Sequence, residues 1–116
     1  MQGKRLDRVN QLIKEEVSML LQRELKDPRL GFVTVTEVET SKDLRSAKIF
    51  VSVLGNDAQW KASMTALDSA RGFVRNWLRQ HLELRVTPEL DFRPDHSLEH
   101  AARIQSLLKQ VRAPGS

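Results

Sequence analysis

Three arginines in the second half of the chain have the spacing and the chemistry of a nucleic-acid contact. Arg71, Arg75 and Arg79 are four residues apart, so a helix places them along one stripe while Val74 and Leu78 face elsewhere. The planar guanidinium of arginine pairs bidentately with phosphate oxygens. A solvated helix face is the alternative that spacing alone leaves open. Because the stripe lies away from the apolar residues, we expect charge reversal there to abolish binding and to leave the fold intact.

A second group of cations lies at the start of the chain. Lys4, Arg5 and Arg8 crowd the beginning of an expected helix, where the helix dipole disfavours positive charge. This placement is a hint of a partner, whereas solvated side chains at a frayed helix end are the explanation that we prefer from this feature alone. Other basic residues are candidates to extend the surface, namely Lys26, Arg29, Lys42, Arg45 and Arg85. The sequence does not show which of them share a face.

One short motif points to an enzyme instead. His96-Ser97-Leu98-Glu99-His100 satisfies H-x-x-E-H, a zinc-protease pattern. Zinc chemistry needs both histidines on one helix face, together with a further carboxylate. His96 falls at or before the expected helix start, so we do not expect that geometry to form. We expect no metal, no cofactor and no catalysis, and a zinc hydrolase is the enzyme-class alternative.

Aromatic side chains offer a further alternative, the stacking of bases. Trp60 and Trp77 lie on helical apolar spacing, which favours the core over a stacking platform. Phe32 and Phe50 lie in expected strands, where stacking on RNA occurs in other folds. Burial is the expectation that we prefer for all four.

The composition bounds the class of protein. A chain of 116 residues that is 40% hydrophobic and 29% charged is typical of one soluble globular domain. Its net charge of +4 makes a polyanionic partner plausible. It has no cysteine, and no apolar run approaches the roughly 20 residues of a membrane span. We expect a cytoplasmic protein that does not contact membranes.

Apolar periodicity predicts the elements that must position these side chains. One amphipathic helix is expected over residues 6–25, followed by a hairpin of two strands that reverses at 41–43. A longer helical pattern over 58–82 is interrupted at Ala70 and Gly72, which predicts two helices that meet at a kink. We expect that kink to make alanine poorly tolerated at position 72.

The rest of the chain completes a single α+β domain over residues 1–112. Residues 84–92 predict a third strand that Pro88 confines to an edge or a bulge. A last helix is expected over 98–111, with residues 113–116 as a flexible tail. Its apolar stripe consists of Leu98, Ala101, Ile104, Leu108 and Val111. We expect helices on one face of a three-stranded sheet to bury every apolar stripe.

The chain resembles bacterial ribosome-binding factor A. The resemblance begins with the run Arg23-Glu24-Leu25-Lys26-Asp27-Pro28-Arg29-Leu30-Gly31. It continues with Ser41-x-Asp43-Leu44-x-x-Ala47-Lys48-Ile49-Phe50-Val51-Ser52-Val53-Leu54. Further matches are Ala70-Arg71-Gly72-Phe73-Val74-Arg75 and Leu84-Arg85-Val86-Thr87-Pro88-Glu89-Leu90. Together these segments span nearly the whole chain.

This resemblance implies a fold and a function. The fold is a type II KH-like arrangement, in the order helix, strand, strand, helix, kink, helix, strand, with an added C-terminal helix. The Gly-x-x-Gly loop with which KH domains clamp RNA is absent, and Ala70-Arg71-Gly72 stands in its place. KH-style clamping of single-stranded RNA is therefore not carried over to this chain.

The implied function is ribosome assembly. Members of the family bind the immature 30S subunit, contact its 16S rRNA, assist late maturation and 5′-end processing of that RNA, and support growth in the cold. The resemblance therefore implies the 30S subunit and 16S rRNA as partners, and we expect a monomer. A general RNA-binding module without a ribosomal target is the alternative, and a domain that binds an acidic protein is another.

Overall fold

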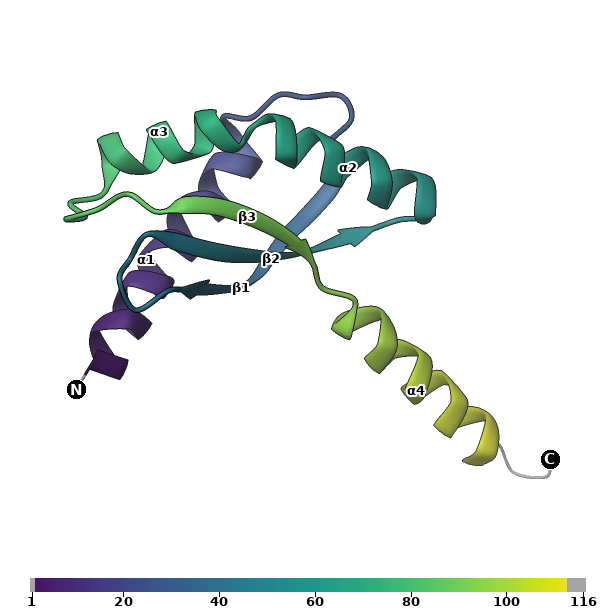
Figure 1. The fold of residues 1–116 in the computed structure, drawn as a ribbon. Helices are drawn as coiled ribbons and strands as arrows, with labels where there is room; N and C mark the ends of the chain where they lie inside the picture. The colour runs from purple at the N-terminus through teal and green to yellow at the C-terminus, as the bar shows by residue number, and fades with distance from the viewer. Residues whose placement is uncertain (1, 113–116) are drawn as a thin grey trace.

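The computed structural model describes residues 2–112, so the tail expected over 113–116 lies outside the described residues. Within that range the chain forms the α+β order that the sequence predicts (Figure 1). The elements are α1 (Gln2–Arg23), β1 (Phe32–Thr40), β2 (Ser46–Leu54), α2 (Asp57–Ser69), α3 (Arg71–His81), β3 (Glu89–Pro94) and α4 (Ser97–Arg112).

The three strands form one mixed sheet in the order β1-β2-β3. Strands β1 and β2 pair antiparallel as a hairpin, whereas β3 pairs parallel to β2. The register shifts between Val35 and Glu37, so Thr36 is the extra residue of a bulge and both Val35 and Val38 are buried. Strand β3 lies at an edge, as predicted from Pro88, the residue that precedes it.

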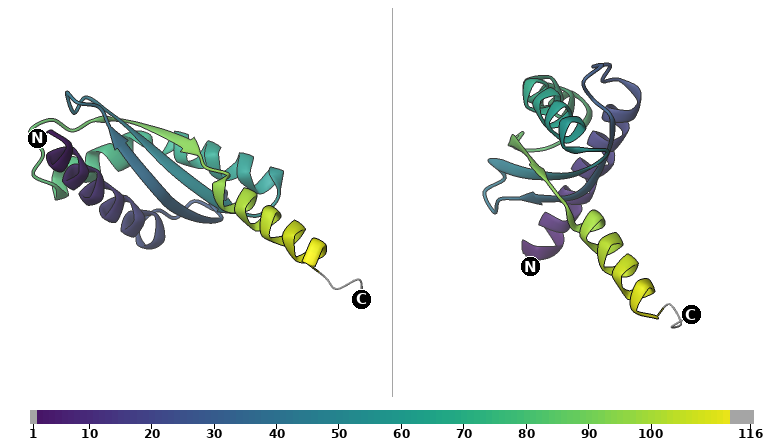
Figure 2. Two further views of the ribbon diagram at one scale, coloured as in Figure 1. Left: turned by 90° about the horizontal axis from the view of Figure 1, so that it is seen from below. Right: turned by 90° about the vertical axis from the view of Figure 1, so that its right-hand side faces the viewer.

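The core lies between one face of this sheet and helices α1, α2 and α3 (Figure 2). The alternation of β2 is confirmed, because Ala47, Ile49, Val51 and Val53 are all buried. Helices α1 and α3 contribute fully buried aliphatic side chains to the same cluster, namely Ile13, Val17, Leu20, Val74 and Leu78. Each such side chain stabilises the fold by about 1.5–3 kcal/mol relative to an exposed one.

Local sequence signals set the helix boundaries. After α1 the carboxylate of Asp27 accepts the backbone N–H of Arg29 at 2.9 Å, which fixes the turn that Pro28 begins. Asn56 caps α2 by accepting the N–H of Gln59 at 2.9 Å, and the Gln59 side chain accepts the Asn56 N–H at 2.7 Å. This reciprocal capping box confirms the predicted helix start.

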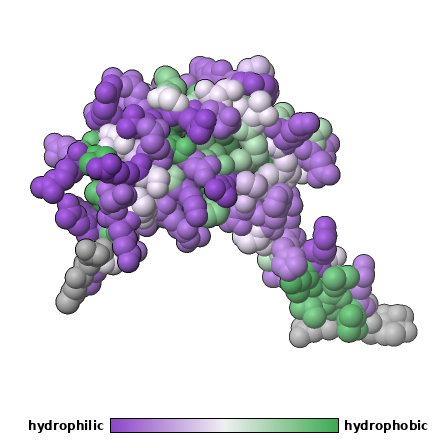
Figure 3. Space-filling model, in the orientation of Figure 1, coloured by the Kyte–Doolittle hydropathy of each residue, from purple (hydrophilic) through white to green (hydrophobic). Residues whose placement is uncertain are grey.

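Helix α4 contradicts the expectation that every apolar stripe is buried. It leads away from the rest of the molecule (Figures 1 and 2), and the larger apolar residues of its stripe are between 43% and 82% exposed. Figure 3 shows them gathered on its surface. Only its start is attached, because Trp60 Nε1 donates to Glu99 Oε1 at 2.7 Å. Its first turns line a hollow with Phe32 and Leu54, but every described side chain of the helix is exposed, so the predicted burial is wrong.

Two smaller expectations also need correction. Residues 84–87 are not strand, because β2 begins at Ser46, which pairs with Glu89, and offers no partner to earlier residues. Phe32 is not buried, because it lies opposite Leu54 at the end of the hairpin and is 80% exposed. Trp60 is buried as expected, and Phe50 is half-buried.

Candidate nucleic-acid interface

Helix α3 separates a buried face from a basic one. Val74 and Leu78 are fully buried against the sheet. The side chains of Arg71 and Arg75 remain 52% and 41% exposed, and Arg79 is exposed as well. The spacing of four residues therefore places the arginines on the outer side of α3.

Two of these arginines have only local, exposed partners. Arg71 Nε lies 3.1 Å from Asp68 Oδ1, three residues earlier. Arg79 Nη2 donates to Asn76 Oδ1 at 2.6 Å. Exposed pairs of this kind contribute about 0–1 kcal/mol. Both guanidinium groups can therefore exchange these partners for phosphate at little cost.

Arg75 has a different role, which the sequence did not reveal. Its Nε donates to the carbonyl of Pro88 at 3.2 Å, and its Nη2 donates to the carbonyl of Thr87 at 3.0 Å. Glu89 Oε1 lies 3.6 Å from the same Nε. Arg75 therefore fixes the segment that leads into β3. The expectation that reversal of all three arginines leaves the fold intact is wrong for this residue, since reversal removes the donor for two carbonyls.

The break between α2 and α3 falls at Ala70, which caps both helices with φ −90° and ψ 0°. Gly72 lies in the first turn of α3, and a Cβ there would meet nothing within 4 Å. Within residues 2–112 a positive φ occurs only at Leu44 and Gly55. Alanine is therefore compatible with position 72, and the expectation that it is tolerated poorly is wrong. A close helix crossing does not explain Gly72 either.

The cations at the start of α1 are exposed, and the fold brings some of them to other basic segments. Lys4, Arg5 and Arg8 form no ion pair with any described residue. Arg5 lines a shallow pocket of about 230 Å³ with Lys42 and Arg85. We call the start of α1, the 41–45 turn, residues 82–88 and α3 the basic end, which lies on the left in Figure 1.

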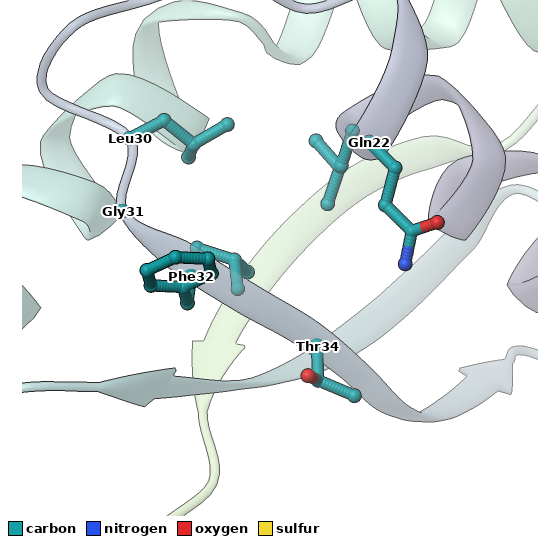
Figure 4. Close-up of a pocket in the computed structure, with 7 residues that line it drawn as sticks. Gln22, Leu30, Gly31, Phe32 and Thr34 are labelled. Carbon is teal, nitrogen blue, oxygen red and sulfur yellow. The ribbon is translucent and has the colours of Figure 1, made fainter.

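A second hollow lies where α1 ends and β1 begins. It has a volume of about 340 Å³, and Figure 4 shows Gln22, Leu30, Phe32 and Thr34 around it. The side chains that line it include no titratable group. The hollow therefore offers neither an acid or base nor a cation, and its lining is part polar and part apolar.

The H-x-x-E-H motif does not assemble a metal site. Helix α4 begins at Ser97, so His96 precedes it, as predicted. His96 Nδ1 lies 3.3 Å from Glu99 Oε2, and its ring lies 4.2 Å from the Trp60 ring. Across residues 2–112 no three side chains of His, Cys, Asp or Glu gather as metal ligands would. These residues attach the first turn of α4 to α2 instead.

The shifted pKa values do not point to acid catalysis. The Arg29 guanidinium lowers the pKa of Asp27 to about 2. The hydroxyl of Ser41 and the backbone N–H of Arg45 lower the pKa of Asp43, and the Thr36 hydroxyl lowers that of Asp95. Each shift favours the charged carboxylate, whereas a general acid needs a raised pKa.

Of the described helices, none has the length and apolarity to cross a bilayer.

Comparison with known proteins identifies the family. The family model described as ribosome-binding factor A matches residues 5–108. A ribosome-binding factor A from Halothermothrix orenii is 47% identical over 112 residues, which are 97% of this chain and 92% of the relative.

Solved structures agree with that match. The crystal structure of ribosome-binding factor A from Thermus thermophilus superposes with a TM-score of 0.69 at 26% identity, covering 77% of this chain and 94% of that one. A homology model of the Thermus thermophilus factor, fitted into a cryo-EM map of its complex with the 30S subunit, gives a TM-score of 0.63 at 27% identity, covering 74% of this chain and 90% of that one. This chain belongs to the ribosome-binding factor A family.

Proposed function

We propose that this protein binds the immature 30S ribosomal subunit, contacts its 16S rRNA through the basic end, and assists late maturation and 5′-end processing of that RNA. Family membership supports the ribosomal target, since a relative of the same fold occurs in a complex with the 30S subunit. The gathering of exposed cations from separate segments at one end is the observation that supports the RNA contact. The protein acts in the cytoplasm as a monomer.

The proposed contact surface includes Arg71 and Arg79 of α3 and Lys4, Arg5 and Arg8 of α1. All five side chains are exposed. Arg75 belongs to the same surface through its exposed part, while its hydrogen bonds position residues 87–88. Contacts between such basic side chains and the phosphates of the RNA backbone position a protein on RNA, but they do not recognise the base sequence. The protein therefore acts by holding one conformation of the RNA until maturation is complete, without a cofactor and without catalysis.

Co-sedimentation tests the target directly. The protein is mixed in turn with free small subunits, mature ribosomes and total RNA at moderate salt. We expect it to pellet with free small subunits and to remain in the supernatant with mature ribosomes. Equal retention on total RNA would favour the general RNA-binding module instead. In a strain that lacks the factor, we expect slow growth in the cold and 16S rRNA with an unprocessed 5′ end, and restoration of both by the wild-type chain.

A further inference from the structure

A small pocket at the basic end gathers three cations from parts of the chain that are distant in sequence. Arg5 comes from the first turns of α1, Lys42 from the turn between β1 and β2, and Arg85 from the segment before β3. The pocket has a volume of about 230 Å³, and its other lining residues are Leu6, Asp43, Leu44 and Val86.

These three cations have no anionic partner within the described part of the chain. The ion pairs of residues 2–112 involve Arg29, Arg71, Arg75, Arg93 and His96. Arg5, Lys42 and Arg85 form neither an ion pair nor a side-chain hydrogen bond there, although all three line the same pocket. Like charges that line one small pocket repel one another. A bound anion would relieve that repulsion.

The one carboxylate in the pocket is already engaged. Asp43 Oδ1 accepts the Ser41 hydroxyl at 2.7 Å and the Arg45 N–H at 3.1 Å. Leu44 adopts φ 63°, a left-handed conformation that non-glycine residues rarely take. Its N–H donates to the Ser41 carbonyl at 2.9 Å. Asp43 therefore shapes the turn that presents Lys42, and its single negative charge offsets only one of the three positive charges in the pocket.

The other walls of the pocket are fixed as well. The Asn10 side chain accepts the Thr40 N–H at 2.9 Å, which ties α1 to the end of β1. The Glu89 N–H donates to the Arg45 carbonyl at 2.8 Å. Arg75 fixes Thr87 and Pro88 beside Arg85, as described above. The backbone segments that present the cations are therefore held in place before any ligand binds.

We propose that this pocket binds one phosphoryl group of RNA between Arg5, Lys42 and Arg85. Two guanidinium groups supply bidentate donors for phosphate oxygens, and the lysine supplies a compact charge. The apolar side chains of Leu6, Leu44 and Val86 suit the sugar beside that phosphate. The inference rests on the proposed RNA contact and names a site for it. Both a backbone phosphodiester and a 5′-terminal phosphate have the required chemistry.

NMR titration of the full chain tests the site with three probes. They are a ten-residue oligouridine with a 5′-hydroxyl, the same oligonucleotide with a 5′-phosphate, and inorganic phosphate. We expect RNA to shift the amide signals of residues 42–45 and the Nε–H signals of Arg5 and Arg85. Shifts with both oligonucleotides identify a backbone phosphate, whereas shifts with the phosphorylated one alone identify a terminal phosphate. A response to inorganic phosphate but to neither RNA would overturn the assignment to RNA.

Matched variants distinguish RNA binding in the pocket from a general effect of the protein's positive charge. Lys42→Gln/Arg85→Gln removes two pocket cations, and Lys61→Gln/Arg103→Gln removes two cations that lie outside it. For the pocket variant we expect about 10-fold weaker oligouridine binding, with a slope of log K against log salt reduced by about one to two. The control should stay within about twofold. Equal losses in both variants would refute the pocket, as would a hexaglutamate peptide that displaces RNA at equal concentration.

Co-sedimentation of the same variants with small subunits keeps this proposal distinct from the proposed function. If the wild-type chain pellets with small subunits and the pocket variant binds oligouridine like the control, the function stands and the pocket is refuted. If the wild-type chain fails to pellet while oligouridine still shifts the pocket signals, the pocket stands and the ribosomal target is refuted. Thermal unfolding confirms that each variant is folded.

Discussion

The two ends of the molecule differ in surface chemistry and in how many hydrogen bonds hold their backbone segments in place. At the basic end, hydrogen bonds accepted by Asn10 and Asp43 and donated by Arg75 fix the three segments that present cations. At the opposite end, which we call the apolar end, Phe32 and Leu54 are exposed and α4 leads away from the core. Trp60, Thr36 and their carboxylate partners anchor only the start of α4.

Both ends present cations, because α4 also has Arg103 and Lys109, but α4 lacks a packed neighbour along most of its length. The basic end adds fixed backbone segments, so ordering them on binding costs little entropy. We therefore propose the basic end as the RNA contact.

The largest expected effect is on binding. Arg5→Glu, Arg8→Glu, Arg71→Glu and Arg79→Glu together leave Arg75 in place and reverse charge at the basic end. We expect at least a 100-fold loss of small-subunit affinity, because each reversal removes an attraction and adds a repulsion of roughly 1 kcal/mol. Arg103→Glu/Lys109→Glu on α4 is the control and should lose less than about threefold. Similar losses in both variants, measured by co-sedimentation, would remove the distinction between the ends.

The next effect separates the two kinds of arginine within the basic end. Arg75→Ala removes the donor for the carbonyls of Thr87 and Pro88, so we expect the free energy of unfolding to fall by about 1–3 kcal/mol. Arg79→Ala removes one exposed hydrogen bond and should cost less than about 0.5 kcal/mol. Urea unfolding of both variants decides the matter. Equal stabilities would mean that Arg75 does not fix this segment.

A smaller effect concerns the anchor of the apolar end. The Thr36 hydroxyl donates to Asp95 at 2.6 Å and is the main cause of that carboxylate's lowered pKa. Thr36→Val should cost about 1 kcal/mol at neutral pH. Because the folded pKa lies below the ordinary value of 3.8, this stabilisation is present above about pH 4 and is lost as the pH falls through the folded value.

The difference between wild type and Thr36→Val should therefore shrink as the pH is lowered from 5 towards 2. Urea unfolding at several pH values measures it. Thr34→Val, in the same strand but without this hydrogen bond, is the matched control. A difference that stays constant with pH would show that the Thr36 hydroxyl does not stabilise the charged form of Asp95.

The smallest effect is at Gly72, between Arg71 and Arg75. Gly72→Ala adds a methyl group in open space, so we expect a gain of about 0.4–1 kcal/mol in unfolding free energy. Small-subunit affinity should not change, because the backbone that positions the arginines is already helical. A loss of stability or of affinity would show that the break extends beyond Ala70.

Local signals in the sequence predicted the elements because their causes are local. The capping box of Asn56 and Gln59 and the alternation of β2 each depend on neighbouring residues, and the structure contains both. The hydrogen bond from Thr36 to Asp95 was not predicted, because the two residues are 59 positions apart in the sequence. The carbonyl partners of Arg75 were missed for the same reason, since spacing along a helix does not show what faces it.

The candidate site was predicted only in part. The residue types and the helical stripe on α3 could be predicted from the sequence. The meeting of Arg5, Lys42 and Arg85 in one pocket depends on the sheet register and on the segments before β2 and before β3. The exposed stripe of α4 shows the same limit. A spacing of three and four predicts an amphipathic helix, and it does not reveal whether this chain buries the apolar face.

Hydrogen exchange measured by mass spectrometry, with and without free small subunits, tests the central assignment most directly. Backbone amides that contact the subunit exchange more slowly in the complex, and each end of the molecule gives its own peptides. We expect slowed exchange at the start of α1, in the 41–45 turn and in residues 82–88. Slowed exchange confined to α4 and the Phe32–Leu54 corner, with no change at the basic end, would contradict it.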